Sequence, residues 1–224
     1  MKNQIHILLL LFFVTYGYSQ DEPINYPNFV GQDFTFIKKN KDWIILDQVS
    51  GHLNDDLRKD MALVLESKDY VNEKRCDDCD ISKSKARIVL VLLYNKGKQI
   101  VHTQNNDFIP RANEGHKELD IEPIIVIENN EFIIFQQYTR SFFSYKFKLQ
   151  DTKLNIVRAT VVQSSISIVE SDKYDFTKGI VTRKTSPISS KEESIKIVKL
   201  KVKPKALSEF KQMHDWKIAE YFYL

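Results

Sequence analysis

A polar stretch at residues 51–60 carries the residue types of an oxygen-ligand metal loop. It reads Gly-His-Leu-Asn-Asp-Asp-Leu-Arg-Lys-Asp and leads directly into an apolar run. Alternate side chains of such loops point inward, so ligands at the first, third, fifth and ninth positions can meet one hard cation such as Ca²⁺. Counted from His52, the later positions hold Asn54, Asp56 and Asp60. The spacing makes these three residues the candidate metal ligands.

The same stretch resembles the Gly-Asp-Leu-Asn-x-Asp-Gly-x-x-Asp signature of bacterial exported proteins with FG-GAP or VCBS-like calcium loops. The wider order is also similar to those proteins: a tryptophan strand at Trp43, the loop, strand pairs, and the Tyr-x-Phe-x-Leu run Tyr145–Leu149. The resemblance extends from Trp43 to Val162. Many of these proteins are single domains without an assigned activity, so the resemblance implies export without naming a substrate.

The loop departs from that signature at two positions. His52 replaces the first aspartate, and imidazole is a poor ligand for calcium, which prefers oxygen. Leu57 replaces the glycine that takes a positive φ, and Arg58 and Lys59 add positive charge nearby. Two interpretations follow: a calcium site formed by the three candidate ligands, or a loop without metal that Asx side chains hold by hydrogen bonds to the backbone. The departures favour the second.

Cys76 and Cys79 form a Cys-x-x-Cys motif and are the only cysteines. A redox dithiol needs a lowered thiol pKa, but the aspartates within and beside the motif would raise it, and Lys74 and Arg75 offset this only in part. A zinc site would need two further ligands, and the sequence has no second motif of this kind. We expect a local disulfide Cys76–Cys79, with redox and metal roles as the alternatives.

The other reactive residue types do not form a catalytic pattern. No serine or cysteine has a nucleophile-elbow context, and the histidines of the mature chain are scattered, at His52, His102, His116 and His214. Aromatic residues alternate through Phe143, Tyr145 and Phe147, where we expect core packing rather than a ligand platform. We therefore assign no catalytic residues.

The N terminus has the order of a secretory signal peptide. Lys2 precedes an apolar run from Ile7 to Val14, and Gly17 and Ser19 suit cleavage after residue 19. The apolar run is shorter than the roughly 18 residues of a membrane span, and no later run approaches that length. The sequence predicts a soluble protein without a membrane span that is periplasmic or secreted.

The composition is that of an ordinary globular protein. The chain has 224 residues, of which 42% are hydrophobic and 12% aromatic, and a formal net charge of +3. Removal of residues 1–19, whose one charged residue is Lys2, leaves 205 residues and a charge of +2. So small a charge argues against a nucleic-acid partner. The length fits one domain with a core, which we place at 34–224 after an extended segment, 20–33.

Short apolar and alternating runs predict about ten strands. The clearest hairpin turns at Asn129-Asn130 and opens a meander of four strands over 123–162. Lysines alternate with apolar residues between Val198 and Lys203, which is typical of a protected edge strand. Only 205–214 has helical spacing. We predict a mainly β class of antiparallel sheets, sandwich-like, barrel-like or partly propeller-like, with one short helix near the C terminus.

Long polar loops at Tyr70–Lys85 and Asn105–Asp120 are the candidate ligand-contacting segments. The first functional hypothesis is a non-catalytic binding or interaction module with a protein or glycan ligand. One alternative is a small extracytoplasmic hydrolase with carboxylates and histidines in a cleft. The other is a calcium-stabilised structural module that depends on the 51–60 loop. We expect no cofactor, with Ca²⁺ at this loop as the alternative.

Overall fold

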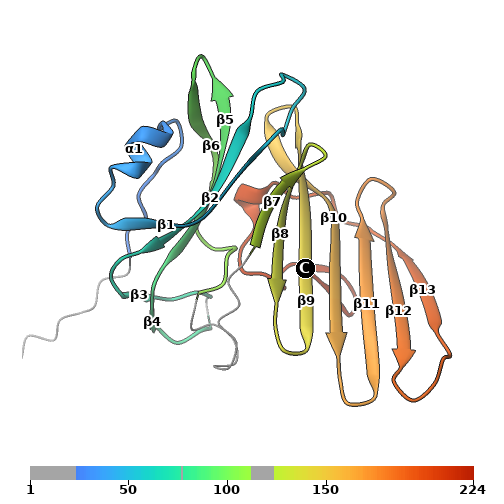
Figure 1. Cartoon of the computed structure of the whole chain (residues 1–224). Coiled ribbons are helices and arrows are strands. Elements are labelled where there is room, and N and C mark those ends of the chain that lie inside the picture. Colours follow the sequence, from blue (N-terminus) through green and yellow to red (C-terminus); the bar gives the residue numbers. More distant parts are fainter. Residues whose placement is uncertain (1–23, 77, 112–123) are drawn as a thin grey trace, which may run out of the picture.

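A computed structural model describes residues 24–76, 78–111 and 124–224. It has two large antiparallel sheets, and Figure 1 shows the first in the chain at the left and the second at the right. The predicted signal peptide, residues 1–19, lies outside the described residues, as does the part of the second long loop after residue 111. None of the helices in the described part is long and apolar enough to cross a membrane.

The first sheet has four strands and the second has seven. The strands of the first, in chain order, are β1 (Trp43–Gly51), β2 (Asp60–Ser67), β5 (Arg87–Asn95) and β6 (Lys98–Asn105), and neighbours follow the same order. The strands of the second are β7 (Ile124–Glu128), β8 (Glu131–Gln137), β9 (Ser141–Gln150), β10 (Lys153–Ser164), β11 (Ile168–Asp175), β12 (Ile180–Pro187) and β13 (Ser194–Lys199), and each pairs with the next. The predicted mainly β, antiparallel class is confirmed.

Two short hairpins and two short helical pieces complete the described elements. These are α1 (Phe34–Lys38), β3 (Val71–Glu73) with β4 (Ser82–Ser84), the 3₁₀ turn η1 (Leu207–Glu209), and β14 (Lys217–Ala219) with β15 (Phe222–Tyr223). The β3–β4 hairpin lies inside the first long loop, Tyr70–Lys85, for which the sequence predicts no strands. Its strands have three residues each, too few to show a period.

The hairpin between β7 and β8 is confirmed at its turn. Asn129 and Asn130 have φ values of 52° and 59°, and Glu128 pairs with Glu131 across them. A two-residue turn with two positive φ values matches the twist of the flanking strands. Strands β7 to β10 are the predicted meander, and β11 to β13 continue it without a crossover.

β2 and β5 are buried on both faces, so their side chains contribute alternately to two cores. One core lies between the sheets and includes Ala62, Val64, Phe132, Tyr145 and Phe147. The other lies on the far face of the four-stranded sheet and includes Leu63, Leu65, Ile88, Leu90 and Phe29. Successive side chains enter opposite cores and both cores are apolar, so these strands are continuous apolar runs in the sequence. Figure 1 shows α1 covering this far face.

Three of the four edges of the two large sheets are covered. Residues 31–33 run along β6, with Gly31 N donating to Val101 O at 2.9 Å. β1 packs against β7, where a Cβ on Gly51 would lie 2.6 Å from the Ile127 side chain and 2.8 Å from its carbonyl oxygen. Glycine is therefore required at position 51 for the two sheets to approach. The free edge is β13.

The C-terminal segment closes the space between the sheets, but not as the helix that 205–214 predicted. Its helical residues are the single 3₁₀ turn Leu207–Glu209. The side-chain amide of Asn105 donates to Leu207 O at 2.7 Å and to Phe210 O at 2.8 Å. These carbonyls are therefore satisfied by a side chain from β6, and the buried Leu207 and Phe210 pack into the core without a helix.

Candidate functional site

The 51–60 loop is held by hydrogen bonds from its own polar side chains. Asn54 Oδ1 accepts from Asp56 N at 3.0 Å, and Asp56 Oδ1 accepts from Arg58 N at 2.8 Å. These are the Asx contacts of the second interpretation. Leu57 has a φ of 59°, so it takes the left-handed conformation of the glycine that it replaces.

Asp60 is fully buried at the base of this loop. Its Oδ2 accepts from Leu53 N and its Oδ1 from Tyr94 N, both at 2.9 Å. His52 Nδ1 lies 3.0 Å from Arg58 O. Within the described residues, no group of three or more histidine, cysteine, aspartate or glutamate side chains is placed to hold a metal ion. The predicted ligands Asn54, Asp56 and Asp60 each bind backbone N–H groups instead.

The predicted disulfide Cys76–Cys79 is present, with 5.1 Å between the Cα atoms. Cys79 N also donates to Cys76 O at 3.3 Å, so the motif closes a tight turn between β3 and β4. Cys76 is exposed and Cys79 is half-buried. The bond constrains the tip of the first long loop.

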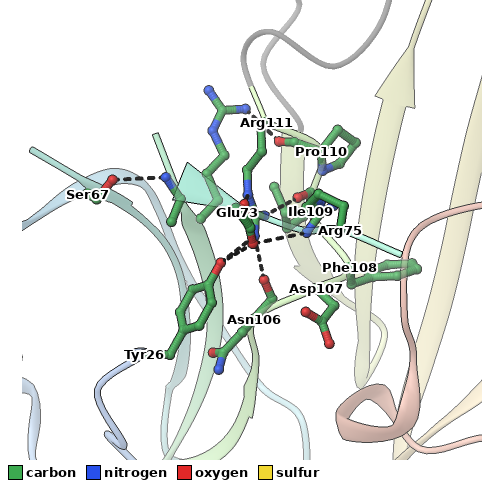
Figure 2. Close-up of polar contacts among 12 residues, drawn as sticks. Tyr26, Ser67, Glu73, Arg75, Asn106, Asp107, Phe108, Ile109, Pro110 and Arg111 are labelled. Carbon is green, nitrogen blue, oxygen red and sulfur yellow. Dashed lines mark hydrogen bonds and ion pairs between the residues drawn. The ribbon is translucent and has the colours of Figure 1, made fainter. Parts of the chain in front are cut away.

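The two long loops meet at a buried ion pair between Glu73 and Arg111 (Figure 2). Arg111 Nε donates to Glu73 Oε2 at 2.9 Å, and Nη2 donates to Oε1 at 2.6 Å. The guanidinium also donates to Ile109 O at 2.7 Å and to Asn106 O at 2.8 Å. The Arg111 side chain is 0% exposed and that of Glu73 is 6% exposed. A charged pair this deep is stable only when its hydrogen bonds are made, as they are here.

Tyr26 joins the N-terminal segment to this pair. Its hydroxyl donates to Glu73 Oε1 and accepts from Arg111 Nη2 at 2.7 Å. Burial alone would raise the pKa of Glu73, but the hydrogen bonds and charge of Arg111 outweigh it and hold that pKa below its usual range. Burial raises the pKa of the Tyr26 hydroxyl. At neutral pH the cluster therefore holds an ionised Glu73 and a protonated Tyr26.

Asn105 fixes the second loop from the other side. Its Oδ1 accepts from Asp107 N at 2.8 Å and from Phe108 N at 2.7 Å, while its amide holds the C-terminal segment. Phe108 is 0% exposed and contacts the rings of Tyr145, Phe147 and Phe210. The backbone of 105–111 is thus tied to both sheets.

A cleft of about 340 Å³ opens where these segments converge. The first loop contributes a disulfide cysteine, charged groups and a hydroxyl, the second contributes two apolar residues, and the β8–β9 turn and the C-terminal segment close the far side. The lining residues are Arg75, Cys79, Asp80, Ser82, Phe108, Pro110, Tyr138, Gln212 and Met213. Apolar side chains and polar groups of both signs are therefore presented together.

His214 follows the cleft residue Met213. Its ring lies 5.7 Å from that of Phe143 and 5.9 Å from that of Tyr223. Burial lowers the pKa of His214, and Asp172 opposes this only in part. The ring is neutral at pH 7 and serves as part of the packing behind the cleft.

The residues that build this site were not singled out from the sequence, apart from Cys79. Glu73 and Arg111 are charged residues in polar loops, where a solvated position is the ordinary expectation. The length of the two polar loops indicated both segments as candidates. It did not indicate the ion pair between Glu73 and Arg111 that joins them. Comparisons with protein-family models, curated proteins and solved structures found no match. The resemblance of the 51–60 loop stays an expectation.

Proposed function

We propose that the chain is an exported, non-catalytic binding module whose ligand occupies the cleft beside the Cys76–Cys79 disulfide. One observation carries the proposal: the two long loops, which are 38 residues apart at Glu73 and Arg111, converge on a single cleft. Loops on a rigid scaffold are the usual carriers of binding residues. The disulfide supports an oxidising compartment, which agrees with the predicted signal peptide.

The walls of the cleft are held in place before any ligand binds. The disulfide constrains the first loop, the Arg111 hydrogen bonds hold the second, and Asn105 ties the second loop to the C-terminal segment. A preorganised site loses less conformational entropy on binding than a mobile one. The cleft volume of about 340 Å³ is within the range of ligand sites, at its small end.

The lining chemistry favours a protein segment as the ligand. Met213 and Tyr138 offer an adaptable apolar surface, and methionine is common where varied apolar side chains must be accepted. Asp80 and Ser82 place polar groups beside it, as suits a peptide with an apolar side chain between polar groups, while the Arg75 side chain is 6% exposed and pairs with Glu73. We therefore propose a short peptide segment with one apolar anchor as the ligand.

The hydrolase alternative has less support. It requires at least two titratable groups that could act as acid and base in one cleft. The described lining of the cleft has one carboxylate, Asp80, and no histidine. No observation in the described residues favours this alternative over the binding module.

The test is a screen of peptide and glycan arrays with the full chain, followed by isothermal titration of each hit. Met213→Glu and Ser82→Arg change the chemistry and volume of the cleft. Ile168→Glu is the matched control, because Ile168 lines a different surface hollow, beside Arg140 and Glu170. We expect peptide hits whose affinity falls at least tenfold in both cleft variants and is unchanged in the control. The proposal would be rejected by glycan hits alone, by the absence of hits, or by peptide hits whose affinity is unchanged in the cleft variants.

A further inference from the structure

β13 is the outermost strand of the seven-stranded sheet and pairs on one side only, with β12. Figure 1 shows it at the end of the sheet that lies away from the four-stranded sheet. The other three edges of the two large sheets are covered, by residues 31–33 or by the contact of β1 with β7. β13 is therefore the strand with backbone groups available for pairing with another chain.

The alternating lysines that protect this edge lie at the end of β13 and beyond it. Lys199, Lys201 and Lys203 are exposed and alternate with half-buried apolar residues, as predicted. Earlier in the strand, Ile195 and Ile197 lie on the same face as Lys199. Val198 lies on the opposite face and packs on the core. Ile195 and Ile197 are 66% and 64% exposed. On this face β13 thus presents isoleucines up to its last residue, Lys199, and the alternating lysines continue beyond the end of the strand.

The hydrogen-bond pattern shows which backbone groups are free. Leu200 N donates to Gly179 O at 2.8 Å, so Leu200 directs its backbone groups toward β12. In an antiparallel pair this direction alternates from residue to residue. The N–H and C=O groups of Ile195, Ile197 and Lys199 therefore point away from the sheet.

We propose that β13 pairs with β13 of a second copy of this chain, antiparallel and with the two-fold axis at Ile197. In this register Ile197 faces its own equivalent, Ile195 faces Lys199 of the second copy, and Glu193 faces Lys201. The four isoleucines form a continuous strip across the junction, and opposite charges meet at both ends. A two-fold interface repeats each contact, so the complementarity counts twice.

Neighbouring registers are disfavoured by charge. A shift that centres the axis on Lys199 brings that lysine opposite itself. A shift that centres it on Ile195 brings Lys199 opposite Lys191. Like charges directly opposite on paired strands are destabilising. The sequence of this edge therefore selects the Ile197-centred register.

The contact is small, so the association is weak. One strand on each side buries less area than the roughly 1,200 Å² of a stable specific interface. We expect a dimer that forms reversibly as the protein concentration rises into the range of tens to hundreds of micromolar. The association is independent of the cleft, and neither proposal requires the other.

The test is sedimentation equilibrium of the full chain across that range. Ile197→Pro removes an N–H that points away from β12, so the internal ladder stays intact while the edge loses a donor. We expect this variant to stay monomeric. Ile166→Lys is the control, because Ile166 is 86% exposed but lies in the β10–β11 turn, and its dimer should match that of the parent chain.

A charge swap tests the register. Lys201→Glu and Glu193→Lys should each weaken the dimer severalfold, and the double variant should restore it, because the pair re-forms with its signs exchanged. Glu193 also binds Lys184 within the chain at 2.5 Å, so restoration in the double variant is the decisive readout. A chain that is monomeric throughout, a dimer that survives Ile197→Pro, or a double variant no better than the singles would overturn the proposal.

Discussion

Arg111 and Glu73 form a two-point contact between the two long loops, with N–O distances of 2.9 and 2.6 Å. The pair joins β3 to the segment that follows β6, and Tyr26 brings the N-terminal segment to the same point. Three parts of the chain that are distant in sequence thus depend on one carboxylate. Loss of the Glu73 carboxylate should therefore lower the stability of the protein and change the shape of the cleft.

We expect Arg111→Met to lower the free energy of unfolding by about 3–5 kcal/mol. Removing Arg111 leaves the buried Glu73 carboxylate with the more distant Arg75, at 3.8 Å, and without the hydrogen bonds of Arg111. Breaking a buried pair in this way is the strongly destabilising case. Urea unfolding followed by tryptophan fluorescence measures the change. Glu73→Gln should destabilise by a similar mechanism, and the two losses should not add, because both remove one interaction.

Lys153→Met supplies the comparison for that experiment. Lys153 binds Glu209 at 3.4 Å, but the two side chains are 64% and 49% exposed. Ion pairs in such positions contribute about 0–1 kcal/mol. A loss in Arg111→Met no larger than in this variant would show that the buried pair does not hold the loops.

The lowered pKa of Glu73 predicts a specific loss of stability in acid. In the unfolded chain its pKa is about 4.3, and in the folded chain it is lower. Between these values the unfolded state binds more protons, so stability is complete above about pH 4.3 and falls as the pH drops toward the folded value. Urea unfolding from pH 6 to pH 3 should show a weaker pH dependence in Glu73→Gln than in the parent chain. Equal slopes would contradict the assignment.

The strands were predictable because the spacing of apolar residues along the sequence matches the pattern of burial in the folded sheets. The run from Met61 to Leu65 is apolar because its side chains divide between two cores. Asn129 and Asn130 supply the two positive φ values that their hairpin turn needs. The prediction of a helix over 205–214 was wrong, because only the 3₁₀ turn Leu207–Glu209 is helical there. A spacing of three among Leu207, Phe210 and Met213 reflects burial, and the hydrogen bonds that replace the helix come from Asn105, about a hundred residues earlier.

The candidate site was predictable only in outline. The length of the two polar loops indicated them as candidate ligand-contacting segments, and the Cys-x-x-Cys spacing predicted the disulfide. The ion pair that joins them depends on the path of β5 and β6 through the sheet, which no local pattern contains. Glu73 is followed by the charged Lys74 and Arg75, and both Glu73 and Arg111 lie in polar loops, so burial could not be assigned to these two.

Leu57→Gly should stabilise the protein by about 0.5–1 kcal/mol. Leu57 has a φ of 59° and its side chain is 87% exposed, so the substitution relieves a strained backbone and removes little packing. The left-handed conformation costs a residue with a Cβ about 1–2 kcal/mol, and the greater freedom of glycine in the unfolded chain returns part of that gain. Chemical unfolding measures the difference. Leu57→Ala keeps the Cβ and should give no gain, so equal effects of both variants would reject the explanation.

Calcium should leave the thermal unfolding of the chain unchanged. Both carboxylate oxygens of Asp60 accept backbone N–H groups at 2.9 Å, and Asn54 and Asp56 hold the turn before Arg58. A cation at this point would have to displace hydrogen bonds that fix the loop. The measurement is the melting temperature with calcium and with chelator, with magnesium as the control ion.

A ligand that binds only the folded state stabilises it by about 2.7 kcal/mol at a hundredfold excess over its dissociation constant. A rise in melting temperature with calcium but not with magnesium would therefore show that the loop rearranges to bind the ion through Asn54, Asp56 and Asp60. Asp56→Ala separates the two cases. If the residue only closes a turn, the variant loses about 1 kcal/mol of stability with or without calcium; if it binds the ion, the variant abolishes the calcium-dependent rise.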